Sequence, residues 1–122
     1  MIDVSDLVGI PYKENGRSKT GLDCYGLAIE VEKRFGKNLK DAVYDNHDKE
    51  LSQKWVPLLN VKQTDFIKAG SIIEIHIAQT LHIAVALDSK TMIHATTNQG
   101  VRISTLGTCS QYLKLAGVYE VI

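Results

Sequence analysis

The clearest pattern along the chain is a row of apolar residues at helical spacing between residues 23 and 36. Asp23 is a residue type favoured at a helix N-cap, and Gly36 stands where a helix commonly ends. Glu30 and Arg34 are spaced to pair on the wet side of this helix. Residues three and four apart share a helix face, so the row predicts one buried side. Its members are Cys24, Leu27, Ala28, Val31 and Phe35.

After Gly70 the apolar residues alternate with period two, which predicts strands. On this alternation Glu74 and His76 are expected to face solvent. Two weaker patterns predict short helices, one over residues 3–8 and one around Leu51 and Trp55 that ends at Pro57. Helices followed by antiparallel strands define an α+β fold with helices on one face of the sheet. The predicted strands cover 73–77, 81–87, 92–95, 101–103 and 117–122.

Length and composition fit one globular domain spanning residues 1–122, with 44% hydrophobic and 23% charged residues. Lysine and arginine equal aspartate and glutamate at 14 each, so nothing favours nucleic acid as a partner. No apolar stretch is long enough for a membrane span, and the start lacks the pattern of a signal peptide. We therefore expect a cytoplasmic protein until delivery, with a trimmed signal, virion association or another export route left open.

Cys24 is the first candidate for chemistry because it stands at a predicted helix start. Free backbone amides and the helix dipole there favour a thiolate, which is a better nucleophile than a thiol. The alternative is an inert cysteine on the buried helix face. The second cysteine, Cys109, is expected to stay unpaired with Cys24. The four histidines form no zinc-protease pattern, so no metal site is expected.

His82 shares a strand face with two small residues, Ala84 and Ala86. Small residues let a helix approach closely, and the interpretation depends on the condition that the Cys24 helix packs on this face. The imidazole would then face the thiol, as nucleophilic catalysis by a cysteine and a histidine requires. A purely structural histidine is the alternative.

His94 follows His82 by twelve positions, an even number. If Asp88–Lys90 form a hairpin loop and Leu87 pairs with Thr91, His94 lies opposite Ala84 and diagonal to His82. It could then fix the orientation of the His82 ring. A loop one residue longer or shorter would turn His94 to the opposite face.

These residues lie in segments that resemble NlpC-type cell-wall cysteine peptidases. The resemblance rests first on GIPYKENGRSKTGLDCYGLAIEVEKRFG, where Asp-Cys-x-Gly-Leu opens a helix after a polar loop. It continues through KAGSIIEI, LHIAVALDSKTMIHAT and VRIS, where the family has a strand, a histidine and a second histidine twelve residues later. The matching blocks cover nearly the whole chain in the family's order.

The resemblance implies a small papain-like α+β domain that cleaves amide bonds in peptidoglycan stem peptides. The family typically cuts between γ-D-glutamyl and a diamino acid and needs no metal or organic cofactor. Cys24 matches its nucleophile, His82 its general base and His94 the orienting third member of the triad. Tyr12 matches a tyrosine lining the site, and Asp23 an acid that helps bind the substrate amine.

Several positions depart from the family pattern, and they bear on the substrate pocket. Tyr25, which we place among the substrate-binding residues, stands where a small serine is usual. Ser71, Ala84 and Ala86 replace the usual aspartate, glycine and tyrosine. The Asp-Cys-Tyr-Gly form resembles versions found beside phage tail genes, which makes phage tail proteins candidate partners. Two other functions stay open, an amidase or acyltransferase on the same scaffold and a non-catalytic tail assembly or binding module.

Overall fold

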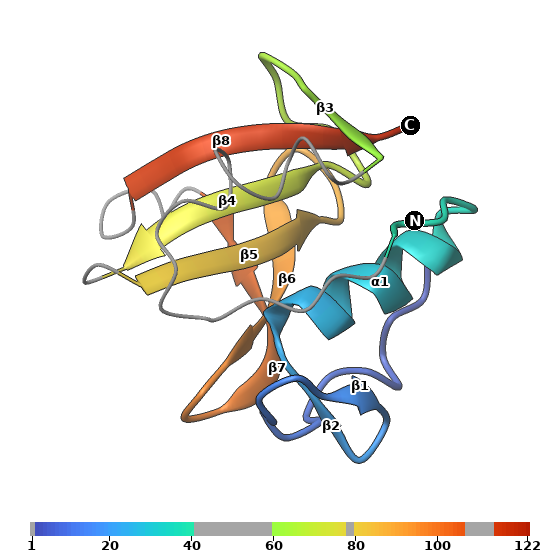
Figure 1. The fold of residues 1–122 in the computed structure, drawn as a ribbon, viewed down its shortest axis with the longest axis vertical. Coiled ribbons are helices and arrows are strands. Elements are labelled where there is room, and N and C mark those ends of the chain that lie inside the picture. The colour runs from blue at the N-terminus through green and yellow to red at the C-terminus, as the bar shows by residue number, and fades with distance from the viewer. Residues whose placement is uncertain (1, 41–59, 78–79, 107–113) are drawn as a thin grey trace.

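The computed structural model describes residues 2–40, 60–77, 80–106 and 114–122 (Figure 1). The described strands form a two-stranded ribbon, β1-β2, and a six-stranded antiparallel sheet in the order β3-β8-β4-β5-β6-β7. No helix within these ranges is long and apolar enough to cross a membrane. The elements are β1 (Arg17–Ser18), β2 (Gly21–Leu22), α1 (Cys24–Arg34), β3 (Val61–Gln63), β4 (Ile72–Ile77), β5 (Thr80–Ala86), β6 (Thr91–Thr96), β7 (Gly100–Thr105) and β8 (Lys114–Val121).

The helix α1 confirms the strongest prediction from the sequence, including both of its ends. Asp23 is the N-cap, and Gly36 follows the C-cap with a φ of 78° that favours glycine. The amide of Lys37 donates to the carbonyl of Glu32 at 2.9 Å, which closes the helix end. The predicted pair of Glu30 and Arg34 is wrong. Arg34 instead donates to Asp6 at 2.8 Å and so ties the N-terminal segment to α1.

The five predicted strands are confirmed as β4 to β8, whereas the helix predicted over residues 3–8 is wrong. That segment is a series of turns in which the amide of Leu7 donates to Val4 and that of Ile10 to Leu7. Six residues are too few to offset the cost of helix nucleation, yet Val4 and Leu7 are still buried. The second predicted helix, around Leu51 and Trp55, lies outside the described residues.

The core has two parts, one on each face of the sheet. α1 packs against β5 and β6 (Figure 1), and its buried side chains share a cluster with Ile83, Val85 and Ile93. Successive strand residues point to opposite faces, so Ala84 and Ala86 lie on the other side. There they join a second cluster with Ile73, Ile75 and Met92.

The condition that α1 packs on the face of His82, Ala84 and Ala86 is therefore not met. Branched residues such as Ile83 and Val85 bury more apolar surface against a helix than alanines do. The small face is instead filled by isoleucines of the neighbouring strand β4. The sequence pattern identified both faces but could not tell which of them the helix covers.

Two acidic side chains are buried, and only one of them had a predicted position. Glu74, predicted to face solvent, accepts a hydrogen bond from the hydroxyl of Tyr119 at 3.0 Å. The side chain of His76 lies outside the described part of the structure. Glu32, on α1, is 0% exposed, and neither of its carboxylate oxygens has a hydrogen-bond partner. Burial disfavours the charged carboxylate and raises the pKa of Glu32 to about 7.

The buried Glu32 predicts a pH-dependent stability that Glu32→Gln removes. The folded chain keeps the proton between the ordinary pKa of 4.5 and about 7, so this contribution is full below pH 4.5 and lost as pH rises through 7. The free energy of unfolding of wild type relative to E32Q should fall by roughly 1–3 kcal/mol between pH 5 and pH 8. Urea unfolding of both proteins at pH 5 and pH 8 measures this difference in unfolding free energy. A difference that is the same at both pH values would contradict the raised pKa of Glu32.

Candidate functional site

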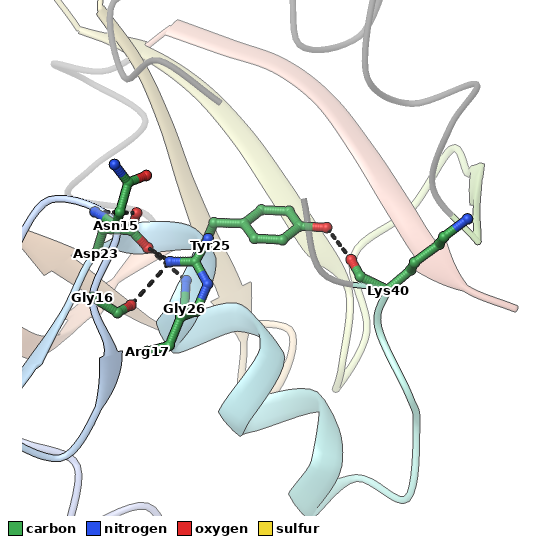
Figure 2. A network of polar contacts seen from close by, with 7 residues as sticks. All are labelled: Asn15, Gly16, Arg17, Asp23, Tyr25, Gly26 and Lys40. Carbon is green, nitrogen blue, oxygen red and sulfur yellow. Dashed lines mark hydrogen bonds and ion pairs between the residues drawn. The ribbon is translucent and has the colours of Figure 1, made fainter. Parts of the chain in front are cut away.

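The carboxylate of Asp23 joins the loop before α1 to the first turn of the helix (Figure 2). It accepts hydrogen bonds from the amide of Gly26 at 2.7 Å, the amide of Asn15 at 3.1 Å and Nη1 of Arg17 at 2.8 Å. Asp23 is 1% exposed, and the Arg17 guanidinium compensates its charge. Three hydrogen bonds to one buried carboxylate fix where the helix begins.

A close approach of two backbone segments supports this arrangement. A Cβ atom at Gly26 would lie 2.2 Å from the carbonyl oxygen of Gly16, closer than any side chain tolerates. The same carbonyl accepts a hydrogen bond from Nη1 of Arg17 at 2.9 Å. Glycine at position 26 therefore lets the polar loop lie directly against the first turn of α1.

Cys24 is the first residue of α1, as predicted, and its thiol is free of any disulfide. The side chain is 3% exposed and belongs to the core cluster that α1 shares with β5 and β6. Its position in the first turn places the sulfur in the positive field of the helix N-terminus.

The two tyrosines predicted to contact substrate occupy different environments. Tyr12 is half-buried against the core and forms an isolated bridge with Leu22 of β2. Tyr25 is 2% exposed, and its hydroxyl donates to the carbonyl of Lys40 (Figure 2). The guanidinium of Arg17 lies 5.6 Å from the centre of the Tyr25 ring. A direct contact between this ring and a substrate would require it to leave the core, and its substrate role stays a prediction.

The hairpin of β5 and β6 confirms the predicted register and brings the two histidines together. Ala84 pairs with His94, and the amide of Leu87 donates to the carbonyl of Thr91. Asp88 closes the loop by accepting hydrogen bonds from the amides of residues 90 and 91. Nε2 of His82 then lies 3.2 Å from Nδ1 of His94, with the ring planes at 86°.

Pairing between β5 and β6 is confined to Ala84–Ala86 and its partners, although both strands continue beyond it. Beyond His94, at Ala95 and Thr96, β6 pairs only with β7 among the described strands. In Figure 1 β6 and β7 turn away from β4 and β5. His82 and His94 therefore lie where the two halves of the sheet part.

Ser104 is a polar neighbour of this pair that the sequence reasoning missed. Its Oγ lies 2.8 Å from Nε2 of His94. In the β6–β7 register Met92 pairs with Ser104 and His94 with Arg102, so Ser104 is the diagonal neighbour of His94 on one face. The short connection between Thr96 and Gly100 sets this register, and it is the feature of the sequence that could have predicted the position of Ser104.

Burial determines the charge of both histidines. It lowers the pKa of His82 from 6.5 to about 4. It also lowers the pKa of His94 to about 4, with smaller effects from His82 and from the positive charge of Arg102. Both rings are neutral at pH 7, and a neutral imidazole has one nitrogen that can accept a proton. Among the described residues no group of three or more His, Cys, Asp and Glu side chains could hold a metal ion.

These pKa values predict an unusual titration. In NMR spectra the ring carbon-bound protons of His82 and His94 should keep neutral-imidazole shifts from pH 8 down to about pH 5 and move only near pH 4. The variants His82→Ala and His94→Ala assign the two resonances. Midpoints near 6.5 for both rings would contradict the burial that the structure assigns to them.

In the described part of the chain, a helix that begins with Cys24 packs on an antiparallel sheet, which is the arrangement of a small papain-like α+β domain. The family model described as NlpC/P60 family matches residues 9–118. The chain therefore belongs to the NlpC/P60 family, as its resemblance indicated.

Curated proteins match the chain at low identity. The chain is 27% identical over 109 residues to "Murein DD-endopeptidase MepS/Murein LD-carboxypeptidase" of Escherichia coli strain K12, a match covering 87% of this chain and 53% of that protein. The proteins of the same name from strains O6:H1 and O157:H7 match equally. The chain thus spans about half the length of the curated relatives it matches.

Solved structures share the fold. An NlpC/P60 family protein from Bacillus cereus has a TM-score of 0.64 at 24% identity, covering 92% of this chain and 35% of that chain. The NlpC/P60 domain of the peptidoglycan hydrolase SagA has a TM-score of 0.62 at 18% identity, covering 94% and 90%. A lipoprotein-like NLP/P60 protein from Staphylococcus aureus also has a TM-score of 0.62 at 23% identity, covering 95% and 38%.

Proposed function

We propose that the protein is a cysteine peptidase that hydrolyses amide bonds in bacterial cell-wall stem peptides. The observation that carries the proposal is the contact of His82 with His94 at 3.2 Å. Both histidines stand on strands that α1 also contacts, and the approach of the Cys24 thiol to His82 is part of the proposal. Family membership and the murein endopeptidase relatives support peptidoglycan as the substrate. The bond proposed is the one between γ-D-glutamyl and a diamino acid.

In the proposed reaction the neutral His82 takes the proton of the Cys24 thiol. The thiolate attacks the amide carbonyl, and the Cys24 backbone amide at the helix start helps to stabilise the oxyanion. The protonated His82 then donates its proton to the leaving amine. Water, activated by the neutral His82, hydrolyses the thioester and regenerates the thiol. His94 orients His82 throughout.

For the substrate we propose contacts from the N-terminal loop, with Tyr12 lining the site. Asp23 is proposed to help bind the substrate amine, and this amine would compete with Arg17 for the buried carboxylate. Tyr25 would act from the core by supporting Arg17. Phage tail partners and the cellular location stay predictions.

Cys24→Ala should abolish hydrolysis of purified muropeptides, because loss of a nucleophile lowers kcat by several orders of magnitude. Cys109→Ala is the control, and it should retain wild-type turnover. Mass spectrometry of the new amino termini identifies the bond. C24A activity within tenfold of wild type would disprove the nucleophile. A folded wild type that cleaves no muropeptide would instead favour a binding module, and release of other acyl products an amidase or acyltransferase.

Loss of the His94 side chain should lower turnover clearly, but less than loss of the His82 side chain. His94→Ala is expected to lower kcat at least about tenfold, because an unsupported imidazole samples unproductive tautomers and orientations. His94→Asn should recover part of the loss, since its amide oxygen can accept the hydrogen bond from Nε2 of His82. Steady-state kinetics of these variants and of His82→Ala rank their kcat values. Unchanged turnover of H94A across pH 5–9 would leave only the pair of Cys24 and His82.

A further inference from the structure

A row of three polar side chains crosses the strands β5, β6 and β7 on one face. Nε2 of His82 lies 3.2 Å from Nδ1 of His94, and Nε2 of His94 lies 2.8 Å from Oγ of Ser104. His94 is buried, and Ser104 is half-buried. Both nitrogens of the His94 ring are therefore engaged by side chains, one on each neighbouring strand.

Two directions of hydrogen bonding fit these positions. Each neutral imidazole carries a single N–H, and a hydroxyl can donate or accept. In one direction Ser104 donates to His94, Nδ1–H of His94 donates to His82, and the remaining proton of His82 sits on Nδ1. In the other direction Nε2–H of His82 donates to His94, and Nε2–H of His94 donates to Ser104. Only the second direction leaves a lone pair on Nδ1 of His82.

The chemistry of His82 selects the second direction. Because Nε2 of His82 is engaged by His94, Nδ1 is the nitrogen left for the thiol proton. A protonated His82 carries N–H on both nitrogens, so its Nε2–H must donate to a bare Nδ1 of His94. The His94 proton then sits on Nε2 and needs an acceptor. The charged and titratable neighbours are His82 on β5 and Arg102 on β7, and a guanidinium accepts no hydrogen bond.

We propose that Ser104 is a positioning residue whose hydroxyl accepts the Nε2–H of His94 and so holds His94 in the tautomer that orients His82. The consequence for turnover rests on the proposed function, whereas the tautomer itself does not. Without the hydroxyl the Nε2–H would be buried without a partner, and unpaired N–H groups are rarer in proteins than unpaired acceptors. The proton would then shift to Nδ1 and reverse the contact with His82.

The test compares Ser104→Thr with Ser104→Val, which have nearly the same shape and differ in the hydroxyl. Both are β-branched and suit a strand. Nitrogen-15 shifts of the His94 ring at pH 7 should show Nε2 protonated in wild type and S104T. In S104V and in the smaller Ser104→Ala, the Nε2–H population should fall and that of Nδ1–H rise. Equal tautomer populations in S104T and S104V overturn the proposal.

Kinetics on muropeptides give the second readout. S104V and S104A should lower kcat about two- to tenfold with little change in KM, and S104T should keep most of the wild-type kcat. Ile103→Thr, which alters the exposed neighbour on β7, controls for effects on the strand. A shifted tautomer with unchanged kcat overturns the positioning role. If folded wild type cleaves no muropeptide, the proposed function fails, while the tautomer measurement still decides the role of Ser104 toward His94.

Discussion

The buried carboxylate of Asp23 is the constraint on which the N-terminal half of the fold depends. A charge removed from water must be compensated, and here the helix amide, the loop amide of Asn15 and the Arg17 guanidinium do so together. These contacts link the loop to the helix start and leave Cys24 as the first helical residue. The same group thus serves as helix cap and loop anchor, one residue before Cys24 in the chain.

The sheet supplies the second half of the candidate site through strand register. The loop closed by Asp88 sets the β5–β6 hairpin, and the hairpin sets which residue lies opposite Ala84. A rigid ladder of hydrogen bonds holds the two rings more closely than two loops would. Burial keeps both histidines uncharged, so the strands provide a base rather than a cation. α1 packs on these same strands, and the approach of the Cys24 thiol to His82 belongs to the proposed function.

Local patterns in the sequence predicted α1, its caps, five strands and the proximity of His82 and His94, because each depends on neighbouring residues or on one hairpin. They failed where contacts with distant segments of the chain determine which side chains are buried and which pair. The periodicity of β5 gave two faces without showing which one the helix covers. Glu32 and Glu74 have polar side chains that a pattern assigns to solvent, yet packing from elsewhere buries them. Arg34 pairs with Asp6 rather than with Glu30 on its own helix. The position of Ser104 beside His94 depends on the register of a second hairpin, between β6 and β7.

The separation of these parts along the chain has a consequence for biosynthesis. The cap, helix and loop around Cys24 involve contiguous residues that leave the ribosome early, whereas β5 to β7 emerge much later. If His82 is the base for Cys24, as proposed, the thiol lacks that base until the late hairpins add to the sheet, and a cysteine with the ordinary pKa of about 8.5 is mostly protonated at neutral pH. The Cys24 thiol of the nascent chain would then be a weak nucleophile. On that proposal, the rate at which alkylating reagents modify Cys24 would report completed folding rather than helix formation alone.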